Sequence, residues 1–290
     1  MILVTGANGH LGKATIEFLI KKINPGQIFG MVRDPQKAED LNTKGIVVRQ
    51  GDYFDYNSLT KAFKGINKLL FISSGTVDDR IKQHKKVIDA AKELGVKHIL
   101  YTSMLNTSSS PYFIPGKDHF ETEKYLKSSG ITYTILRNAY YIDVLPMLIG
   151  EALTTGKIYY PAGEGRVSFT ARVDMAEATA NILVNQGHEN KIYPFGVNTS
   201  YSFQDIAKAL SELANKQIDY VDIPLETMRQ ELLKKKTPEF LVNMLTQLAE
   251  SFKHNEGNYP DPTLENLLGR KPVGLKEFLK NTYLPVEQLV

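Results

Sequence analysis

The sequence contains no cysteine. Disulfide bridges, thiolate nucleophiles and cysteine-based metal sites are therefore excluded. No apolar stretch approaches the ~20 residues that a membrane-spanning helix requires. The first residues, Met1 to Thr5, already have the pattern of a strand, which leaves no room for a secretory signal peptide. These absences predict a soluble, cytoplasmic protein that does not contact a membrane.

A large excess of charge of one sign is also missing. The net charge of +3 is too small to predict nucleic-acid binding. The longest basic run, Lys234–Lys236, is more typical of a solvated helix face than of a binding patch. No pair among the six histidines has the spacing of a metal-binding motif. We therefore expect neither nucleic acid nor a metal ion as a ligand.

Through its first half, the sequence alternates short apolar runs with amphipathic stretches. Strands that alternate with helices imply a parallel sheet covered on both faces. Ligands of such sheets bind beyond the carboxyl ends of the strands, where the strand order reverses. The expected strands are Ile2–Thr5, Ile28–Val32, Ile46–Arg49, Lys68–Ile72, His98–Thr102 and Tyr133–Arg137, with helices near 11–22, 35–43, 57–63, 79–94 and 117–128.

The alternation ends after Arg137, and helical patterns then dominate. Asp174 and Ser202 are placed to cap the helices that follow them, at about 175–185 and 203–214. The other expected elements are a strand–turn segment at Lys157–Thr170 and helices near 225–236 and 238–255.

These patterns predict an α/β fold: a Rossmann-type doubly wound parallel sheet with a smaller, mainly helical C-terminal domain. A chain of 290 residues is long enough for this combination. We expect the sheet domain to comprise residues 1–150, with a return segment near 170–198, and the smaller substrate-side domain to comprise 199–290.

A glycine-rich loop joins the first strand to the first helix. Glycines there allow a tight turn and let a pyrophosphate approach the helix N-terminus, and the third allows close helix–strand packing. The alternative is a purely structural turn, but the strand–turn–helix context favours a dinucleotide site. The predicted cofactor-binding residues of the loop are Gly6, Ala7, Asn8, Gly9, His10, Leu11 and Gly12.

Arg33 follows the second strand, at the distance from the glycines where such folds usually carry an acidic residue that binds the ribose. An arginine there suits the 2′-phosphate of NADP(H). The neighbouring Asp34 precedes a proline and is expected to cap the next helix, while Lys37 could assist with the phosphate. We therefore expect NADPH rather than NADH, the alternative being that Arg33 is simply exposed.

Polar residues after two further strands suit a cofactor that lies across the sheet. Asp52 follows the third strand, where its carboxylate could accept the adenine amino group. Ser73, Ser74 and Gly75 follow the fourth strand, beside the predicted switch point, where small residues allow ribose and pyrophosphate to approach. Each of these segments would be an ordinary turn by itself. Their placement after successive strands favours a cofactor site.

The chain resembles the short-chain dehydrogenase/reductase superfamily. Its loop has that superfamily's Gly-x-x-Gly-x-x-Gly form, and Ser103 ends the fifth strand where the superfamily places a serine. The superfamily's Tyr-x-x-x-Lys pair on the next helix is represented by Phe120 and Lys124. Phe120 and Lys124 share one helical face, with Thr122, Tyr125 and Leu126 on roughly the opposite one.

Within that superfamily the sequence looks most like the atypical NmrA-like branch, especially its bacterial NADPH quinone reductases and triphenylmethane reductases. The resemblance runs nearly end to end and includes the missing tyrosine. It implies NADP(H) contacts from residues 6–12, Arg33, residues 73–75, Ser103, Lys124 and the segment 137–141, notably Asn138 and Tyr140. The similar stretches are VTGANGHLG, MVRDPQKA, VRQGDY, KLLFISS, GVKHILYTS, HFETEKYL, YTILRNAYY and GHENKIY.

Phe120 cannot donate a proton, which makes reduction of a simple ketone hard because a basic alkoxide must form. A quinone or cationic dye needs no such donor. We therefore expect hydride transfer from NADPH to a quinone-like acceptor, with Lys124 as the catalytic residue of the pair. Phe120, Tyr140 and Tyr141 are the predicted substrate-pocket residues, although core packing would explain either tyrosine equally well. His119 could act as an acid, but a surface role is favoured.

Two alternatives share the fold and the glycine loop. One is an NmrA-type protein that senses the dinucleotide with little or no catalysis; retention of Lys124 favours an enzyme. The other is a sugar-nucleotide epimerase, which needs the missing tyrosine as its base.

Overall fold

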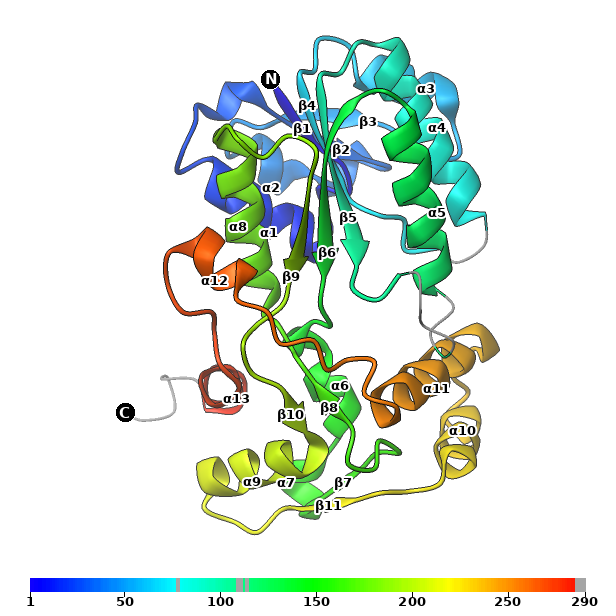
Figure 1. The fold of residues 1–290 in the computed structure, drawn as a ribbon, viewed down its shortest axis with the longest axis vertical. Coiled ribbons are helices and arrows are strands. Elements are labelled where there is room, and N and C mark those ends of the chain that lie inside the picture. Colours follow the sequence, from blue (N-terminus) through cyan, green and yellow to red (C-terminus); the bar gives the residue numbers. More distant parts are fainter. Residues whose placement is uncertain (77–78, 108–111, 113–114, 285–290) are drawn as a thin grey trace. The chain divides into compact units, whose positions relative to one another are not determined.

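Within the part of the chain that the computed structural model describes (residues 1–76, 79–107, 112 and 115–284), seven parallel strands form one sheet. The strand order is β3-β2-β1-β4-β5-β6-β9 (Figure 1). β1 and β4 are therefore neighbours, and the order reverses between them. This confirms the predicted doubly wound sheet. The strands are β1 Ile2–Val4, β2 Ile28–Val32, β3 Val47–Gln50, β4 Lys68–Phe71, β5 His98–Met104, β6 Thr132–Asn138 and β9 Lys191–Phe195.

The last strand, β9, was not predicted as a separate element. It pairs in parallel with β6 alone, so it forms one edge of the sheet. Its exposed Ile192 and its Pro194 are tolerated at an edge, where one side of the strand makes no ladder bonds. The weak apolar pattern that results explains why local reasoning missed it.

Helices cover both faces of the sheet (Figure 1). α1 (His10–Leu19) packs beside α8 (Arg172–Val184) on one face, and α3 (Tyr56–Ala62), α4 (Arg80–Glu93) and α5 (Pro115–Ser128) lie on the other. Alternate strand residues, such as Leu3, Phe71 and Tyr101, form the core under α3, α4 and α5. The short elements of this unit are η1 Pro25–Gln27, η2 Pro35–Lys37 and α2 Glu39–Asn42.

A second unit has its own core, in which Tyr160 stacks on Phe203 with ring centroids 4.3 Å apart. It contains a parallel pair, β7 with β11, and an antiparallel pair, β8 with β10. Its elements are η3 Ile142–Val144, α6 Leu145–Ile149, α7 Ala152–Thr155, β7 Lys157–Tyr159, β8 Arg166–Val167, β10 Tyr201–Ser202, α9 Phe203–Ala214, β11 Asp219–Val221, α10 Leu225–Lys234, α11 Glu239–Lys253, α12 Thr263–Leu268 and α13 Leu275–Tyr283.

Contacts divide the chain into unit 1 (residues 1–108, 115–138 and 172–195) and unit 2 (residues 109–114, 139–171 and 196–290). Residues 139–150 thus group with unit 2, although we expected the sheet domain to extend to residue 150. The reason is that the chain leaves the sheet after β6 and forms η3 and α6, whose apolar residues join the core of unit 2.

Two of the three predicted helix caps are confirmed. The Asp34 carboxylate accepts the Gln36 amide at the start of η2. Ser202 forms a reciprocal capping box with Asp205 at the start of α9. The prediction for Asp174 was wrong, because α8 already begins at Arg172 and Asp174 is buried inside its first turn. An acidic residue in a first turn still interacts favourably with the helix dipole.

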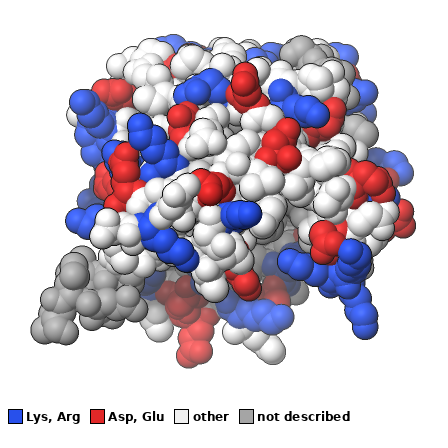
Figure 2. Space-filling view, turned by 90° about the horizontal axis from the view of Figure 1, so that it is seen from below, with Lys and Arg blue, Asp and Glu red and all other residues white. Residues whose placement is uncertain are grey.

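Charged side chains do not gather into a field of one sign on the face shown in Figure 2. Lys and Arg are interspersed there with Asp and Glu. This face lacks the continuous basic surface that is typical of nucleic-acid binding. Among the residues that the structure describes, no helix is long and apolar enough to cross a membrane.

Candidate functional site

The glycine loop has a shape that other residues would not tolerate. Gly6 has a positive φ of 58°, in the left-handed region, and its carbonyl oxygen accepts the Gly9 amide at 2.8 Å. A Cβ on Gly12 would lie 2.4 Å from the same oxygen. The Ala7 amide donates to the Met31 carbonyl at 3.2 Å, which holds the loop against the end of β2. The loop is therefore a close-fitting connection between β1 and α1.

The loop ends at a helix N-terminus that suits an anion. Gly9 is the N-cap of α1 and provides no side-chain cap, so the first helical amides have no partner within the helix. The helix dipole adds positive potential at this end. Asn8 Oδ1 is buried and has no hydrogen-bond partner among the described residues. The amides of the first turn, which have no partner within the helix, suit a bound pyrophosphate, whereas the Asn8 oxygen requires a hydrogen-bond donor.

Arg33 lies directly after β2, at the carboxyl edge of the sheet, and is exposed. Its carbonyl accepts the Gln50 side chain at 3.2 Å, whereas its guanidinium forms no ion pair with any residue that the structure describes. The nearby Lys37 is instead paired with Asp34 at 3.7 Å. Arg33 is thus the better placed of the two cations for a phosphate.

Asp52 is part of a turn after β3, where its Oδ1 accepts the Phe54 amide at 2.9 Å. Sequence reasoning missed its neighbour, Tyr53. The Tyr53 hydroxyl donates to the Ile72 carbonyl oxygen at 2.7 Å and lies 2.5 Å from Thr5 Oγ1, so it ties the ends of β1 and β4 together. Burial raises the pKa of this phenol. Tyr53 thereby stabilises the switch point at which the cofactor is expected.

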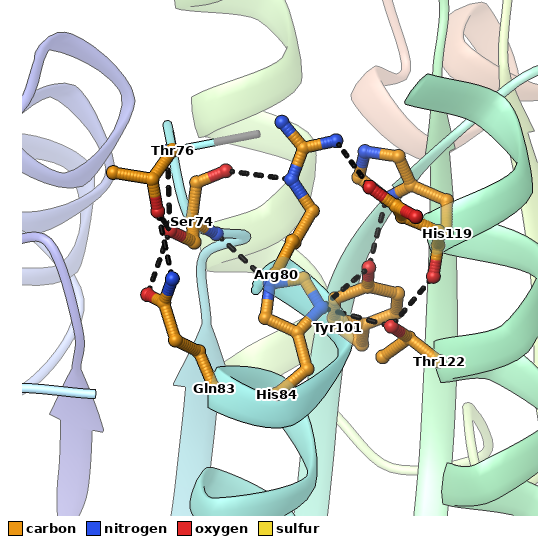
Figure 3. A network of polar contacts seen from close by, with 9 residues as sticks. Ser74, Thr76, Arg80, Gln83, His84, Tyr101, His119 and Thr122 are labelled. Carbon is orange, nitrogen blue, oxygen red and sulfur yellow. Dashed lines mark hydrogen bonds and ion pairs between the residues drawn. The ribbon is translucent and has the colours of Figure 1, made fainter. Parts of the chain in front are cut away.

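The serines after β4 are only partly available for a ligand. The Ser73 amide donates to Thr102 Oγ1 at 2.9 Å. Ser74 is bound on three sides: its amide donates to His84 Nε2 at 3.0 Å, its hydroxyl lies 3.0 Å from Gln83 Oε1, and its carbonyl accepts Arg80 Nε at 3.2 Å (Figure 3). Gly75 is exposed, with open space where a Cβ would stand.

The contacts of Ser74 belong to a polar network beneath the carboxyl edge of the sheet (Figure 3). His84 Nε2 accepts the Ser74 amide, so the ring carries its proton on Nδ1, which lies 2.8 Å from Thr122 Oγ1. The Tyr101 hydroxyl lies 2.8 Å from His119 Nδ1. The network thus joins β4, β5, α4 and α5.

The surface role favoured for His119 was wrong, because its side chain is 8% exposed. Burial first, and then the charge of Arg80, lower the pKa of His119 to about 3. Burial, His119 and Arg80 lower the pKa of His84 to about 2. Both imidazoles are therefore neutral at ordinary pH. Helical spacing indicated that His119 and Phe120 lie on different sides of α5. It did not show that the side with His119 packs against α4 and is buried.

α5 presents Phe120 and Lys124 on one side, as predicted. Phe120 is half-buried, while the Lys124 side chain is 59% exposed. The Lys124 ammonium lies 5.6 Å from the centroid of the Phe120 ring and 3.2 Å from a Glu121 oxygen. Thr122 and Leu126 are buried on the other side of the helix. The pair that would be Tyr and Lys is here a phenyl ring with an accessible ammonium.

Ser103 does not stand free at the end of β5. It is buried, and its hydroxyl donates to Glu123 Oε1 at 2.6 Å. Glu123 also accepts hydrogen bonds from Arg137 of β6, through Nε at 3.0 Å and Nη2 at 2.7 Å. Sequence reasoning missed Glu123, because nothing local distinguishes it from the exposed glutamate two residues earlier. The hydroxyl of the serine that the superfamily places after the fifth strand is here bound by a carboxylate.

The predicted aromatic residues after β6 lie in unit 2. Tyr140 meets Phe252 edge-on, with centroids 4.8 Å apart, and its hydroxyl lies 3.5 Å from Ser251 Oγ. Burial raises the pKa of Tyr140 to about 12. Tyr141 is half-buried and forms a β-bridge with Thr170. Asn138 is buried at the end of β6 in unit 1. In the described part of the chain, no cluster of side chains could hold a metal ion.

Comparison with known proteins agrees with this geometry. The profile of the NmrA-like family matches residues 1–288. Quinone oxidoreductase 2 of Escherichia coli K12 is 37% identical over 284 residues, which cover 98% of this chain and 99% of that protein.

Two solved structures are similar over nearly their whole length. An NADPH-dependent quinone oxidoreductase of Escherichia coli in complex with NADPH has a TM-score of 0.93 at 37% identity, covering 98% of this chain and 100% of that one. The triphenylmethane reductase of Citrobacter sp. in complex with NADP(H) has a TM-score of 0.92 at 35% identity, covering 97% of this chain and 99% of that one.

Proposed function

The chain belongs to the NmrA-like family, and from this premise we propose that it transfers a hydride from NADPH to a quinone or a similar flat electrophile. The observation that carries the proposal is the pairing of Phe120 with Lys124 on α5. This pairing keeps the cation of the superfamily's Tyr-x-x-x-Lys pair and lacks its acid. Acceptors that need no proton during hydride addition are the ones that such a site can serve.

The residues present fit NADP(H). The loop from Gly6 to Gly12 and the N-terminus of α1 would hold the pyrophosphate, Arg33 the 2′-phosphate and Lys124 the nicotinamide ribose. Gly75 and the backbone near Ser73 leave room for the cofactor after β4. When bound, NADPH supplies the hydride. The chain then needs only to hold the nicotinamide face against the acceptor and keep the two aligned.

Phe120 would form part of the acceptor pocket. A quinone that receives a hydride becomes a phenolate, which is weakly basic, so water can protonate it afterwards. The buried Ser103 and the neutral His119 are therefore not required as donors. A small-molecule acceptor and a cytoplasmic location remain predictions.

The test is NADPH oxidation by the purified protein with a panel of quinones, triphenylmethane dyes, simple aldehydes and sugar nucleotides. We expect turnover with quinones and dyes only. Epimerisation consumes no NADPH in net turnover, so the sugar nucleotides are also analysed for an epimerised product; such a product would favour an epimerase, although Phe120 cannot act as its base. NADPH binding without turnover of any acceptor would instead favour the dinucleotide sensor.

Arg33→Ala is expected to weaken NADPH binding about tenfold to a hundredfold and to leave NADH binding nearly unchanged. A charge-assisted contact with the 2′-phosphate contributes ~1.5–3 kcal/mol, and NADH lacks that phosphate. Calorimetric dissociation constants for both cofactors measure the effect. Lys22→Ala, which removes an exposed cation beyond α1, is the control. Equal losses for NADPH and NADH would exclude this role for Arg33.

Lys124→Met is expected to raise the NADPH dissociation constant about threefold to tenfold, because an exposed hydrogen bond to the ribose contributes ~1 kcal/mol. No ionisation should disappear from the pH profile of quinone reduction, since Lys124 has no tyrosine to influence. Lys117→Met removes another exposed cation of α5 and should leave binding unchanged. Loss of a rate-controlling pKa in Lys124→Met would show that Lys124 is the proton donor.

A further inference from the structure

Glu123 is the one acidic residue of the central part of α5 that is turned inward. Its side chain is 1% exposed, whereas Glu121 of the same helix is 48% exposed. Carboxylates are almost never fully buried unless they are paired. Glu123 lies between Phe120 and Lys124 in sequence, so fixing its position also restricts the positions of these two side chains. A buried charge at this place needs a physical reason.

The contacts of Glu123 join three elements. Ser103 of β5 and Arg137 of β6 are direct neighbours in the register of these parallel strands. The Glu123 carboxylate accepts Ser103 Oγ at 2.6 Å and two guanidinium nitrogens of Arg137 at 3.0 and 2.7 Å. Two parallel charge-assisted bonds of this kind fix both distance and orientation. We refer to Ser103, Glu123 and Arg137 as the α5 clamp.

The α5 clamp works together with a second anchor on the same helix. The Thr122 hydroxyl lies 2.8 Å from His84 Nδ1 of α4. Thr122 and Glu123 are successive residues, so their directions differ by about 100° around the helix axis. Anchors in two directions fix the rotation of α5. Among the described residues, the ammonium of the exposed Lys124 has polar or cation–π contacts with Glu121 and the Phe120 ring alone, and both lie on its own helix.

We propose that Glu123 is the positioning residue of the reductase site, which it serves by fixing the rotation of α5 and hence the reach of Lys124 and Phe120 to the nicotinamide. This inference rests on the proposed function. Glu123 also binds Ser103, which removes that hydroxyl from the acceptor. Misplacement of reacting groups by ~1 Å can lower a rate on the order of a hundredfold, so loss of the α5 clamp should lower the rate of hydride transfer.

The test is a double-mutant cycle in NADPH binding. Lys124→Met should raise the dissociation constant about threefold to tenfold in the wild-type chain, but less than about twofold in a Glu123→Gln chain, where the lysine is already misplaced. Glu277→Gln, the same change at an exposed position of α13, should leave the effect of Lys124→Met intact. An equal effect of Lys124→Met in the wild-type and Glu123→Gln chains would overturn the proposal.

Two further arms keep the test decisive. If Glu123→Gln does not fold, as judged by its thermal melt, Arg137→Lys keeps the charge, loses the paired geometry and should suppress the Lys124→Met effect in the same way. If Lys124→Met has no effect in the wild-type chain, the rate of benzoquinone reduction at saturating NADPH decides. Glu123→Gln should lower that rate at least about tenfold, and a rate within twofold of the wild type would overturn the proposal.

The proposed function can fail separately from this inference. A wild-type chain that binds NADPH but reduces no acceptor would refute the reductase, while the binding cycle would still show whether Glu123 positions Lys124. A chain that reduces quinones but shows no coupling between Glu123 and Lys124 would retain the proposed function and lose the positioning role.

Discussion

Benzoquinone is expected to be reduced at least about a hundredfold faster than a simple aldehyde at saturating NADPH. A positioned general acid contributes roughly 10²–10⁴-fold to reactions that need one. Phe120 stands where that acid would be, and Ser103 is bound to Glu123. Reduction of an aldehyde therefore lacks the whole rate enhancement that a general acid would give. Reduction of a quinone is slowed little, because its product is a weakly basic phenolate.

The rates are measured as NADPH oxidation, with the reaction in the absence of protein subtracted because quinones also react slowly without a catalyst. The rate with benzoquinone should change little between about pH 6 and pH 8. His119, whose pKa is lowered to about 3 by burial and by Arg80, does not titrate in that range. Equal turnover of the aldehyde and the quinone would reveal a hidden acid and refute this mechanism.

Acid should destabilise the protein steeply, through His84 and His119. Burial lowers the pKa of these side chains to about 2 and about 3, from an ordinary value of 6.5. Below pH 6.5 the unfolded chain binds protons that the folded chain does not, so the free energy of unfolding decreases as the pH falls. Each histidine contributes a slope that approaches ~1.4 kcal/mol per pH unit below its ordinary pKa, and the two together cost about 3 kcal/mol between pH 6.5 and pH 5.

Urea unfolding between pH 5 and pH 7 measures this slope. Each of His84→Gln and His119→Gln should reduce it by ~1.4 kcal/mol per pH unit below pH 6, whatever its effect on stability at pH 7. An unaltered slope in both buried-histidine variants would show that these imidazoles can be protonated in the folded chain.

Several features could be read from the sequence because they depend on neighbours along the chain. A strand followed by glycines and a helix requires a loop in which Gly6 has a positive φ and Gly12 has no room for a side chain. The alternation of apolar runs predicts parallel strands, and the doubly wound sheet confirms it. The spacing of Phe120 and Lys124 predicts one shared helical face for the same reason.

Only the tertiary structure decided which polar residues are buried together. Glu121 and Glu123 are indistinguishable in sequence, and the register of β5 with β6 selects Glu123 by placing Ser103 beside Arg137. The pKa of His119 is lowered because packing against α4 buries its side chain and brings Arg80 close to it, from about 40 positions away. Local patterns determine backbone conformation over a few residues. The burial and charge of a side chain depend on elements that folding brings together from distant parts of the chain.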